Sequence, residues 1–465
     1  MSQVTNLGFP RIGRKRELKT ALENYWKGTL DAAALHATAR ELRQRHWQLQ
    51  REAGADVVPV NDFTLYDHVL DTAWLFGAMP SGYLELADTD PLAAYFATAR
   101  GHKSAGRDLR ALEMTKWFDT NYHYLVPELT RDQAFALRGD KPIAEFLEAR
   151  ALGYEARPVL LGPVSFLLLS KTVDGSDRLA LLDKLVPVYA ELLGKLADAG
   201  AEWVQIDEPF LALDLCDAAQ HAFRYAYRTL AEARTPKLLL ATYFSGLDEN
   251  LPLAMSLPAH GLHVDLVRAP HLLDAVLDQL PDDRVLSLGL VDGRNIWHTD
   301  LHAALNLVKR ARASISTRRL QLAPSCSLLH VPIDAGMETA LDPELHSWLA
   351  FAREKLAELR TLSDAAEGDA AAIGGRRLAR IAESTQNIRA DGQSASSRTT
   401  KTDNGADGTA SLRLRDPAPY PSKRPRPARV SDDDNRFVPA DRRGTPRARC
   451  APRGQAQRCG LPVLP

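Results

Sequence analysis

Short apolar segments alternate with amphipathic helical stretches along about the first 360 residues of the 465-residue chain. This alternation is typical of a parallel β-sheet whose strands are joined by crossover helices. Because eight strand–helix units close a barrel, the pattern predicts an α/β protein with a TIM-type (β/α)8 barrel over residues 1–365. Nine segments are strand candidates, so we expect one of them to lie outside the barrel sheet: VTNLGFP, ADVVPVNDF, WFDTNYHYLVP, RPVLLGPVSF, EWVQIDEP, KLLLATYF, GLHVDLV, VLSLGLVDG and LQLAPSCSLL.

Helical periodicity fills the gaps between these segments, for example from Asp31 to Ala53 and from Leu179 to Ala199. An open, doubly wound sheet is the alternative architecture for such a pattern. It is the weaker prediction, because no Gly-rich dinucleotide fingerprint follows a strand candidate.

The composition changes after residue 365. From Asn387 onward, Ser, Thr, Asp, Gly, Arg and Pro dominate, and apolar periodicity almost disappears. Such a segment cannot bury enough apolar surface to offset the entropy lost on ordering. We therefore expect residues 366–465 to form a disordered, low-complexity tail.

The charge balance argues against nucleic acid or a membrane surface as a partner, since the net charge is -1 and the pI is about 6.9. No apolar run approaches the ~18–20 residues of a membrane span. The N-terminus, MSQVTNLGFP, has no apolar signal segment. Four cysteines are too few and too scattered for a disulfide framework, namely Cys216, Cys326, Cys450 and Cys459. These features predict a cytoplasmic protein.

A barrel binds its ligand at the C-terminal ends of its strands and in the loops that follow them. The strand candidates of this chain end in polar residues, so we expect these residues to surround the ligand-binding face: Arg11, Asn61, Asp62, Asn121, His123, Asp207, Glu208, Tyr243, His263, Asp265, Asp292, Arg294, Asn295, Ser325 and Cys326.

The segment LGFPRIGRKRELK, Leu7–Lys19, joins the first strand candidate to a helix that the periodicity predicts from Lys15 onward. Its apolar stripe is Leu18, Leu22 and Trp26, and its basic residues are Arg14, Lys15, Arg16 and Lys19. Cations at a helix N-terminus oppose the macrodipole by roughly 0.3–1 kcal/mol each. An anionic ligand would reverse this penalty, because backbone N–H groups, dipole and side chains would face the same negative charge. A solvated basic helix start is the simpler interpretation.

Asp207 and Glu208 are adjacent carboxylates at a strand end. Neighbouring residues on a strand point to opposite faces, so a catalytic acid/base pair would need a bulge. A structural role at the barrel rim is the favoured interpretation.

A zinc site has few candidate ligands in the barrel region, which are Cys326, His330, His260 and His263. Their spacing does not match a recognised zinc motif, because no second pair of soft ligands accompanies Cys326 and His330. A buried thiol and unrelated imidazoles are the favoured interpretation.

Eleven segments of the sequence resemble the N-terminal half of the cobalamin-independent methionine synthase family. They follow the family order over roughly residues 3–360: LGFPRIGRKRELK, RELRQRHWQLQREAG, VNDFTLYDHVL, EMTKWFDTNYHYLVPE, RPVLLGPVSFL, EWVQIDEP, LLLATYF, GLHVDLV, GLVDGRNIW, SCSLLHVPID and SWLAFAREKL.

The resemblance implies two face-to-face barrels and the transfer of a methyl group from 5-methyltetrahydropteroyltriglutamate to homocysteine, forming methionine. In the family the second barrel holds zinc, which keeps the homocysteine thiol deprotonated. The first barrel helps to hold the polyglutamate tail of the folate. The family's tail-binding positions fall on Arg16, Glu17, Leu18, Lys19 and Lys116 of this sequence. Lys116 could then close a cationic clamp with Arg16 and Lys19.

The family's zinc ligands are a His-x-Cys pair, a Glu and a distant Cys, and the sequence after Arg360 does not contain this set. We therefore expect the chain as written to carry no catalytic or metal-binding residues and to be inactive alone. A non-catalytic folate-binding module, an inactive relic, and a separate barrel hydrolase using Asp207 or Glu208 are the alternatives.

The tail suggests a cause for this departure. If Arg429–Arg447 is back-translated with free choice of third bases and read one nucleotide later, it gives AFPTTTIGSFPQTAEAR. That string resembles the start of the family's second barrel. We therefore expect a frameshift between about Gly374 and Arg429, either natural or from sequencing.

Overall fold

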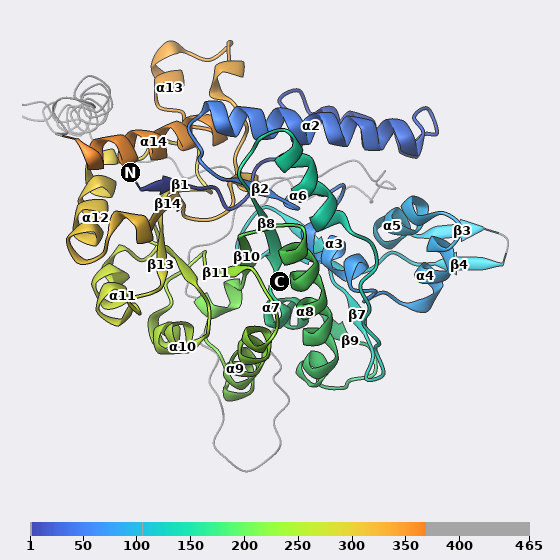
Figure 1. Cartoon of the computed structure of the whole chain (residues 1–465). Helices are drawn as coiled ribbons and strands as arrows, with labels where there is room; N and C mark the ends of the chain where they lie inside the picture. The colour runs from blue at the N-terminus through green and yellow to red at the C-terminus, as the bar shows by residue number, and fades with distance from the viewer. Residues whose placement is uncertain (1, 105, 369–465) are drawn as a thin grey trace, which may run out of the picture. The chain divides into compact units, whose positions relative to one another are not determined.

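The computed structural model describes residues 2–104 and 106–368 (Figure 1). The predictions of a disordered tail and of a frameshift fall almost entirely on residues 369–465 and lie outside the described residues.

The central element is a sheet of eight parallel strands (Figure 1). In their order around the sheet the strands are β1 (Gln3–Val4), β14 (Leu320–Pro324), β13 (Val285–Val291), β12 (Gly261–Asp265), β11 (Lys237–Ala241), β10 (Trp203–Asp207), β8 (Ala156–Leu161) and β2 (Val58–Val60). A parallel bridge between Thr5 and Val57 joins the two outer strands of this order, so the sheet closes on itself. The predicted barrel is confirmed.

Eight of the nine strand candidates form the barrel, and the segment WFDTNYHYLVP is the one outside it. Part of it forms β6 (His123–Leu125), which pairs antiparallel with β5 (Met114–Lys116). This segment is polar and aromatic, and its partner is adjacent in sequence, so a local hairpin satisfies its backbone without a place in the barrel. The remaining short strands are β3 (His102–Ser104), β4 (Arg107–Leu109), β7 (Glu128–Leu129) and β9 (Lys171–Thr172).

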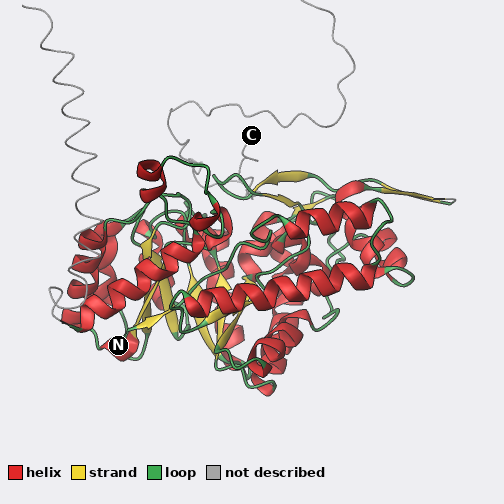
Figure 2. Ribbon diagram, turned by 90° about the horizontal axis from the view of Figure 1, so that it is seen from above, coloured by secondary structure: helices red, strands yellow, loops and turns green. Residues whose placement is uncertain are grey.

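Helices surround the ring of strands, as the view from above also shows (Figure 2). They are α1 (Glu17–Trp26), α2 (Ala32–Glu52), α3 (His68–Leu75), α4 (Ser81–Ala87), α5 (Pro91–Arg100), α6 (Lys141–Ala151), α7 (Pro163–Leu169), α8 (Leu182–Asp198), α9 (Asp217–Glu232), α10 (Leu251–Ser256), α11 (Leu273–Gln279), α12 (Leu301–Ser314), α13 (Pro343–Ser347) and α14 (Ala352–Glu367). Helices α2 and α8 match the predicted helices within a few residues. None of the described helices combines the length and the apolar character that crossing a membrane requires.

The barrel core is built from strands that are apolar on both faces, as parallel strands covered by helices must be. Leu238, Leu239 and Leu240 of β11 are at most 1% exposed. Arg157 is buried in the barrel interior, where its guanidinium donates to Gln205 Oε1 at 3.2 Å and to Gln321 Oε1 at 3.1 Å. These hydrogen bonds make the burial of its charge tolerable.

Helix α1 begins at Glu17, two residues later than the sequence predicted. Arg16 precedes it in the left-handed conformation, with φ of 60°, which breaks the helix at that point. The predicted apolar stripe is confirmed, because Leu18 and Leu22 are buried and Trp26 packs against the same cluster.

Candidate functional site

The loops after the barrel strands enclose a cavity of about 240 Å³ at the C-terminal face, here called the mouth cavity. Six of the predicted strand-end residues line it, namely Arg11, Asn61, Asp62, His123, Asp207 and Tyr243. The other predicted residues do not line this cavity, namely Asn121, Glu208, His263, Asp265, Asp292, Arg294, Asn295, Ser325 and Cys326. The prediction of a polar face is therefore correct for about half of the strand ends.

The β5–β6 hairpin lies over this face. The Trp117 ring packs edge-on against His68, with 4.2 Å between ring centroids. Tyr122 packs in the same way against His330, at 5.3 Å. Next to Trp117, the Phe118 ring contacts the aromatic residues that follow two barrel strands, which are Phe210 and Phe244. The hairpin thus covers the cavity with aromatic side chains.

Four of the five predicted tail-binding residues are consecutive at the start of α1. The side chains of Arg16 and Lys19 are exposed. Arg16 forms no ion pair or side-chain hydrogen bond within the described residues, and Lys19 has a long contact of 3.7 Å with Glu23. Both cations are therefore available to an external anion.

Glu17 and Leu18 are placed differently. The Glu17 carboxylate turns back toward the loop, where it accepts the Lys15 N–H at 2.8 Å and lies 3.3 Å from Arg45 Nη1. Leu18 is 1% exposed, and its N–H donates to the Ile12 carbonyl at 3.2 Å. Hydrogen bonds to the Glu17 carboxylate outweigh its burial and lower its pKa. Both residues shape the loop that presents the cations.

The fifth predicted residue, Lys116, is the last residue of β5, and its side chain is exposed. No ion pair or hydrogen bond joins it to residues 16–19 in the described part of the chain. Both segments belong to the C-terminal face, because the α1 loop follows β1 and the hairpin contacts the loops after β10 and β11.

Two further basic residues of the Leu7–Lys19 segment already have protein partners. Arg14 Nη2 lies 2.7 Å from Asp334 Oδ2, which Arg353 also contacts. Arg11 donates to the backbone and the hydroxyl oxygen of Thr64. Arg14, Lys15 and Arg16 therefore precede the helix, and its first turn contains the acidic Glu17 as well as Lys19.

Asp207 and Glu208 do not form a catalytic pair. Asp207 lines the mouth cavity and accepts hydrogen bonds from Gln205 and from the Tyr243 hydroxyl at 3.0 Å. Glu208 is 0% exposed and accepts the Ser165 N–H at 2.8 Å, at the start of α7. The Glu208 carboxylate thus caps a helix, as the structural interpretation predicted.

The candidate zinc ligands do not fit a metal. Cys326 is fully buried, and burial raises the pKa of its thiol well above the usual range. The His263 ring is held by Ser287 Oγ at 2.9 Å and by the Ser325 carbonyl at 3.3 Å. Within residues 2–104 and 106–368, no group of three or more His, Cys, Asp or Glu side chains could hold a metal ion.

Sequence reasoning missed several residues of the mouth cavity. Asp67 and His68 follow β2, and the Asp67 carboxylate joins α3 to the hairpin by accepting the Leu70 and Leu125 N–H groups at 2.7 and 3.0 Å. The sequence does indicate these two residues, because polar residues follow a strand candidate in the segment VNDFTLYDHVL. Their function depends on the hairpin, which lies more than 40 residues further along the chain.

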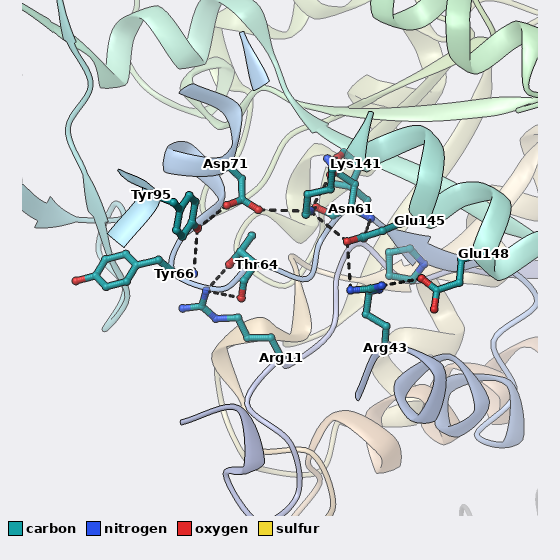
Figure 3. Close-up of polar contacts among 12 residues, drawn as sticks. Arg11, Arg43, Asn61, Thr64, Tyr66, Asp71, Tyr95, Lys141, Glu145 and Glu148 are labelled. Atoms are coloured by element: carbon teal, nitrogen blue, oxygen red, sulfur yellow. Dashed lines mark hydrogen bonds and ion pairs between the residues drawn. The ribbon is translucent and has the colours of Figure 1, made fainter. Parts of the chain in front are cut away.

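Lys141 was also missed, and Figure 3 shows its surroundings. Its ammonium group donates to Asn61 Oδ1 at 2.9 Å and lies 3.4 Å from Asp71 and 3.5 Å from Glu145. The Tyr95 hydroxyl donates to the other oxygen of Asp71 at 2.6 Å. This network fixes the loop after β2, in which Asn61 adopts a left-handed φ of 66°.

Several carboxyl groups and imidazoles of the mouth cavity have shifted pKa values because they are buried. Burial raises the pKa of Asp62, Asp67 and Asp207 to about 7 in each case, although hydrogen bonds to each group act in the opposite direction. Burial also lowers the pKa of His68 to about 3 and that of His330 to about 4, so both imidazoles are neutral at pH 7.

Known proteins share this fold and sequence. Residues 3–316 match the family described as "Cobalamin-independent synthase, N-terminal domain". The 5-methyltetrahydropteroyltriglutamate–homocysteine methyltransferase of Xylella fastidiosa (strain M23) is 65% identical over 365 residues, which cover 78% of this chain and 48% of that protein. The enzyme of the same name from Chelativorans sp. (strain BNC1) is 56% identical over 380 residues, covering 79% and 49%. The chain thus spans about half the length of these curated relatives.

Two solved structures share the fold at low sequence identity. The putative vitamin-B12 independent methionine synthase from Listeria monocytogenes has a TM-score of 0.50 at 15% identity and covers 78% of this chain and 98% of that one. The B12-independent methionine synthase from Shewanella sp. W3-18-1 has a TM-score of 0.51 at 14% identity, with coverage of 73% and 91%. By its sequence match and its barrel, this chain belongs to the cobalamin-independent methionine synthase family.

Proposed function

We propose that the barrel of this chain binds the polyglutamate tail of 5-methyltetrahydropteroyltriglutamate, through Arg16, Lys19 and Lys116 as direct contacts. The observation that carries the proposal is the availability of these three cations, which are exposed at the C-terminal face and lack a short ion pair within the described residues. A tail of several carboxylates provides one anion for each cation.

Glu17 and Leu18 act in this site as positioning residues. The Glu17 carboxylate organises the turn before α1 through the Lys15 N–H and Arg45, and Leu18 anchors the helix in the core. A carboxylate facing the tail would repel it, so the inward orientation of Glu17 favours binding.

The methyl transfer itself requires more than this barrel. The curated relatives named as the methyltransferase are about twice as long as the part that this chain matches. We infer that homocysteine and zinc are bound outside the barrel, which offers no fitting metal ligands among its described residues. We also propose that the barrel forms one domain, which ends with α14 at Glu367, two residues beyond the predicted boundary at 365, and that the residues after it form a separate tail, in a cytoplasmic protein.

The contribution of the cations can be estimated. Charge-assisted hydrogen bonds are worth about 1.5–3 kcal/mol each when partly desolvated, and less on an open surface. Because this chain supplies only one of the two barrels expected around the folate, its affinity for the folate should be in the millimolar range, at about −4 kcal/mol.

Isothermal titration of the purified chain with monoglutamyl and triglutamyl folate, at low and high salt, tests the proposal. We expect the triglutamyl form to bind more tightly and added salt to reduce the difference. Lys116→Ala should abolish most of the triglutamyl preference. Lys103→Ala is the matched control, because the Lys103 side chain is 84% exposed and lies in the separate β3–β4 hairpin.

Equal affinity for the two folates in the unmodified chain would contradict the tail site. An unchanged preference in Lys116→Ala would remove Lys116 from it. Methionine formation by the chain alone in the presence of zinc would contradict the inference that homocysteine and zinc are bound outside the barrel.

A further inference from the structure

The mouth cavity is separate from the proposed tail site, because neither residues 16–19 nor Lys116 lines it. Its volume of about 240 Å³ is smaller than the roughly 300–1,000 Å³ of pockets for drug-sized ligands. The C-terminal mouth of a barrel is the usual place for a ligand in this fold. The cavity therefore has the position and the size of a site for a small molecule.

The acidic groups of the cavity already have partners. Asp67 accepts two backbone N–H groups, and Asp71 accepts the Tyr95 hydroxyl and contacts Lys141. Asp207 accepts from Gln205 and Tyr243. The fourth carboxyl group, Asp62, accepts the Phe9 N–H at 2.7 Å. A cationic ligand would have to compete with these bonds.

The donors of the cavity are less fully used. Arg11 donates through Nη1 to Thr64, and its Nε and Nη2 atoms donate to no described residue. The His330 Nδ1 atom is buried and has no hydrogen-bond partner in the described part of the chain. The ring of His68 likewise forms no hydrogen bond there. A neutral imidazole carries one N–H group, so each of the two rings can donate one hydrogen bond, and together with Arg11 they favour a ligand that accepts hydrogen bonds.

These donors lie close to one another. The charge of Arg11 acts on both the His68 ring and Tyr122. Tyr122 in turn packs against His330. Three segments far apart in sequence thus bring one guanidinium and two neutral imidazoles to the same cavity, and the Trp117 and Phe244 rings connect the two imidazoles.

Apolar side chains also line the cavity, among them Trp117, Leu161 and Leu329. Three cations line the cavity: Lys141 is paired with Asp71, Arg138 is exposed, and Arg11 is half-buried without an acidic partner among the described residues. The charge of Arg11 therefore matches a ligand with one negative charge, while a dianion would be repelled by the nearby carboxyl groups. The Arg11 fork suits the two oxygen atoms of a carboxylate.

We propose that the mouth cavity binds a small organic monocarboxylate with an apolar body, whose carboxylate is held by Arg11, His68 and His330. The apolar body then packs against Trp117, Leu161 and Leu329. This site is additional to the proposed polyglutamate site and uses none of its residues.

Calorimetric titration of the full chain with 4-methylpentanoate as the probe tests the proposal, with 4-methylpentanamide as the uncharged analogue. We expect saturable binding of the acid and binding of the amide that is about tenfold to a hundredfold weaker, because the amide lacks the charge that strengthens the hydrogen bonds. Triglutamyl folate should not displace the acid, which distinguishes this site from the tail site.

Two variants locate the carboxylate. Arg11→Gln should weaken the binding of 4-methylpentanoate by about tenfold or more. His330→Phe keeps the aromatic packing against Tyr122 and Phe244 while removing both ring nitrogens, so it should also weaken binding without unfolding the chain. Thermal unfolding of each variant checks that it is folded, and Lys103→Gln is the control for loss of one surface charge.

Absence of saturable binding to the unmodified chain would overturn the proposal. Equal affinity for the acid and the amide, an unchanged affinity in folded His330→Phe, or displacement by triglutamyl folate would each overturn it as well. Failure of this experiment leaves the polyglutamate proposal untouched, since the two sites share no residue.

Discussion

At the residue scale, the chemistry at the end of β10 was predicted from alternation alone. Adjacent strand residues point to opposite sides, and the structure places Asp207 in the mouth cavity and Glu208 at the N-terminus of α7. The partners of Glu208 were not predictable, because Ser165 and Tyr227 lie in other elements and meet it only in the closed barrel.

Gly162 illustrates how tightly this carboxylate is packed. A Cβ atom added at Gly162 would lie 2.1 Å from Glu208 Cδ. We expect Gly162→Ala to lower the free energy of unfolding by about 1–3 kcal/mol, because the buried Glu208 cannot move without losing its bonds to α7. Gly194→Ala is the control. Gly194 lies inside α8, where Ala is the better helix former, and a Cβ atom added there would meet only the Arg234 carbonyl oxygen, at 3.7 Å. Urea unfolding measures both, and equal stabilities of the two variants would contradict this packing.

The charge of Glu208 should make stability depend on pH. Burial raises its pKa from 4.5 to about 7 in the fold. The folded state therefore keeps the proton over a range in which the unfolded state has lost it, so the contribution of Glu208 to stability is fully present below pH 4.5 and is lost as the pH rises through 7.

We expect Glu208→Gln to flatten this decrease and to be relatively more stable at pH 8 than at pH 5, by up to about 3 kcal/mol. Urea unfolding at the two pH values is the measurement, with Asp274→Asn as an exposed control. A pH dependence of stability that is identical in Glu208→Gln and the unmodified chain would show that Glu208 is ionised throughout.

At the scale of elements, the strands and the long helices followed from periodicity, since burial on both faces of a strand and on one stripe of a helix leaves a direct pattern in the sequence. The β5–β6 hairpin did not follow. Its position over the cavity depends on aromatic contacts with loops from across the barrel, such as those of Phe118 with Phe210 and Phe244. No local pattern encodes such contacts.

One ion pair fastens this hairpin to the barrel. Arg294 donates to Asp119 Oδ1 at 2.7 Å and to the Asp119 carbonyl at 2.8 Å, and its guanidinium lies over the Phe244 ring. We expect Arg294→Ala to raise the rate of hydrogen exchange in residues 114–125, corresponding to a local loss of about 1 kcal/mol.

The matched control is Arg234→Ala, which removes an exposed pair with Asp198 on another part of the surface. Exchange measured by mass spectrometry should leave the barrel strands unchanged in both variants. Unaltered exchange of the hairpin in Arg294→Ala would show that the aromatic packing and the Asp67–Leu125 hydrogen bond hold it without this ion pair.

At the scale of the whole molecule, α14 completes the barrel. Lys355 on α14 is fully buried and donates to the Trp297 carbonyl at 3.0 Å, while Arg360 donates to the Gly54 carbonyl at 2.7 Å. This helix therefore joins the loop after β13 to the turn before β2, close to the place where the sheet closes.

A chain that ends after Gly368 should unfold cooperatively at the same temperature as the full chain, because it keeps all of α14. A chain that ends after Ala350 should lose cooperative unfolding, since the buried partners of Lys355 and Arg360 would be left without donors. Calorimetry of the two shortened chains tests the domain boundary. If the chain that ends after Gly368 unfolds at a lower temperature than the full chain, residues beyond 368 belong to the folded unit.

The central claim is that exposed cations on two separate segments bind one polyglutamate tail. A crystal structure of the chain with bound 5-methyltetrahydropteroyltriglutamate tests it most directly. The account predicts tail carboxylates within hydrogen-bond distance of Arg16 and Lys19 at one end and of Lys116 at the other, with Glu17 still turned toward Arg45. Density for the tail in the mouth cavity, or contacts with α1 but none with Lys116, would contradict it.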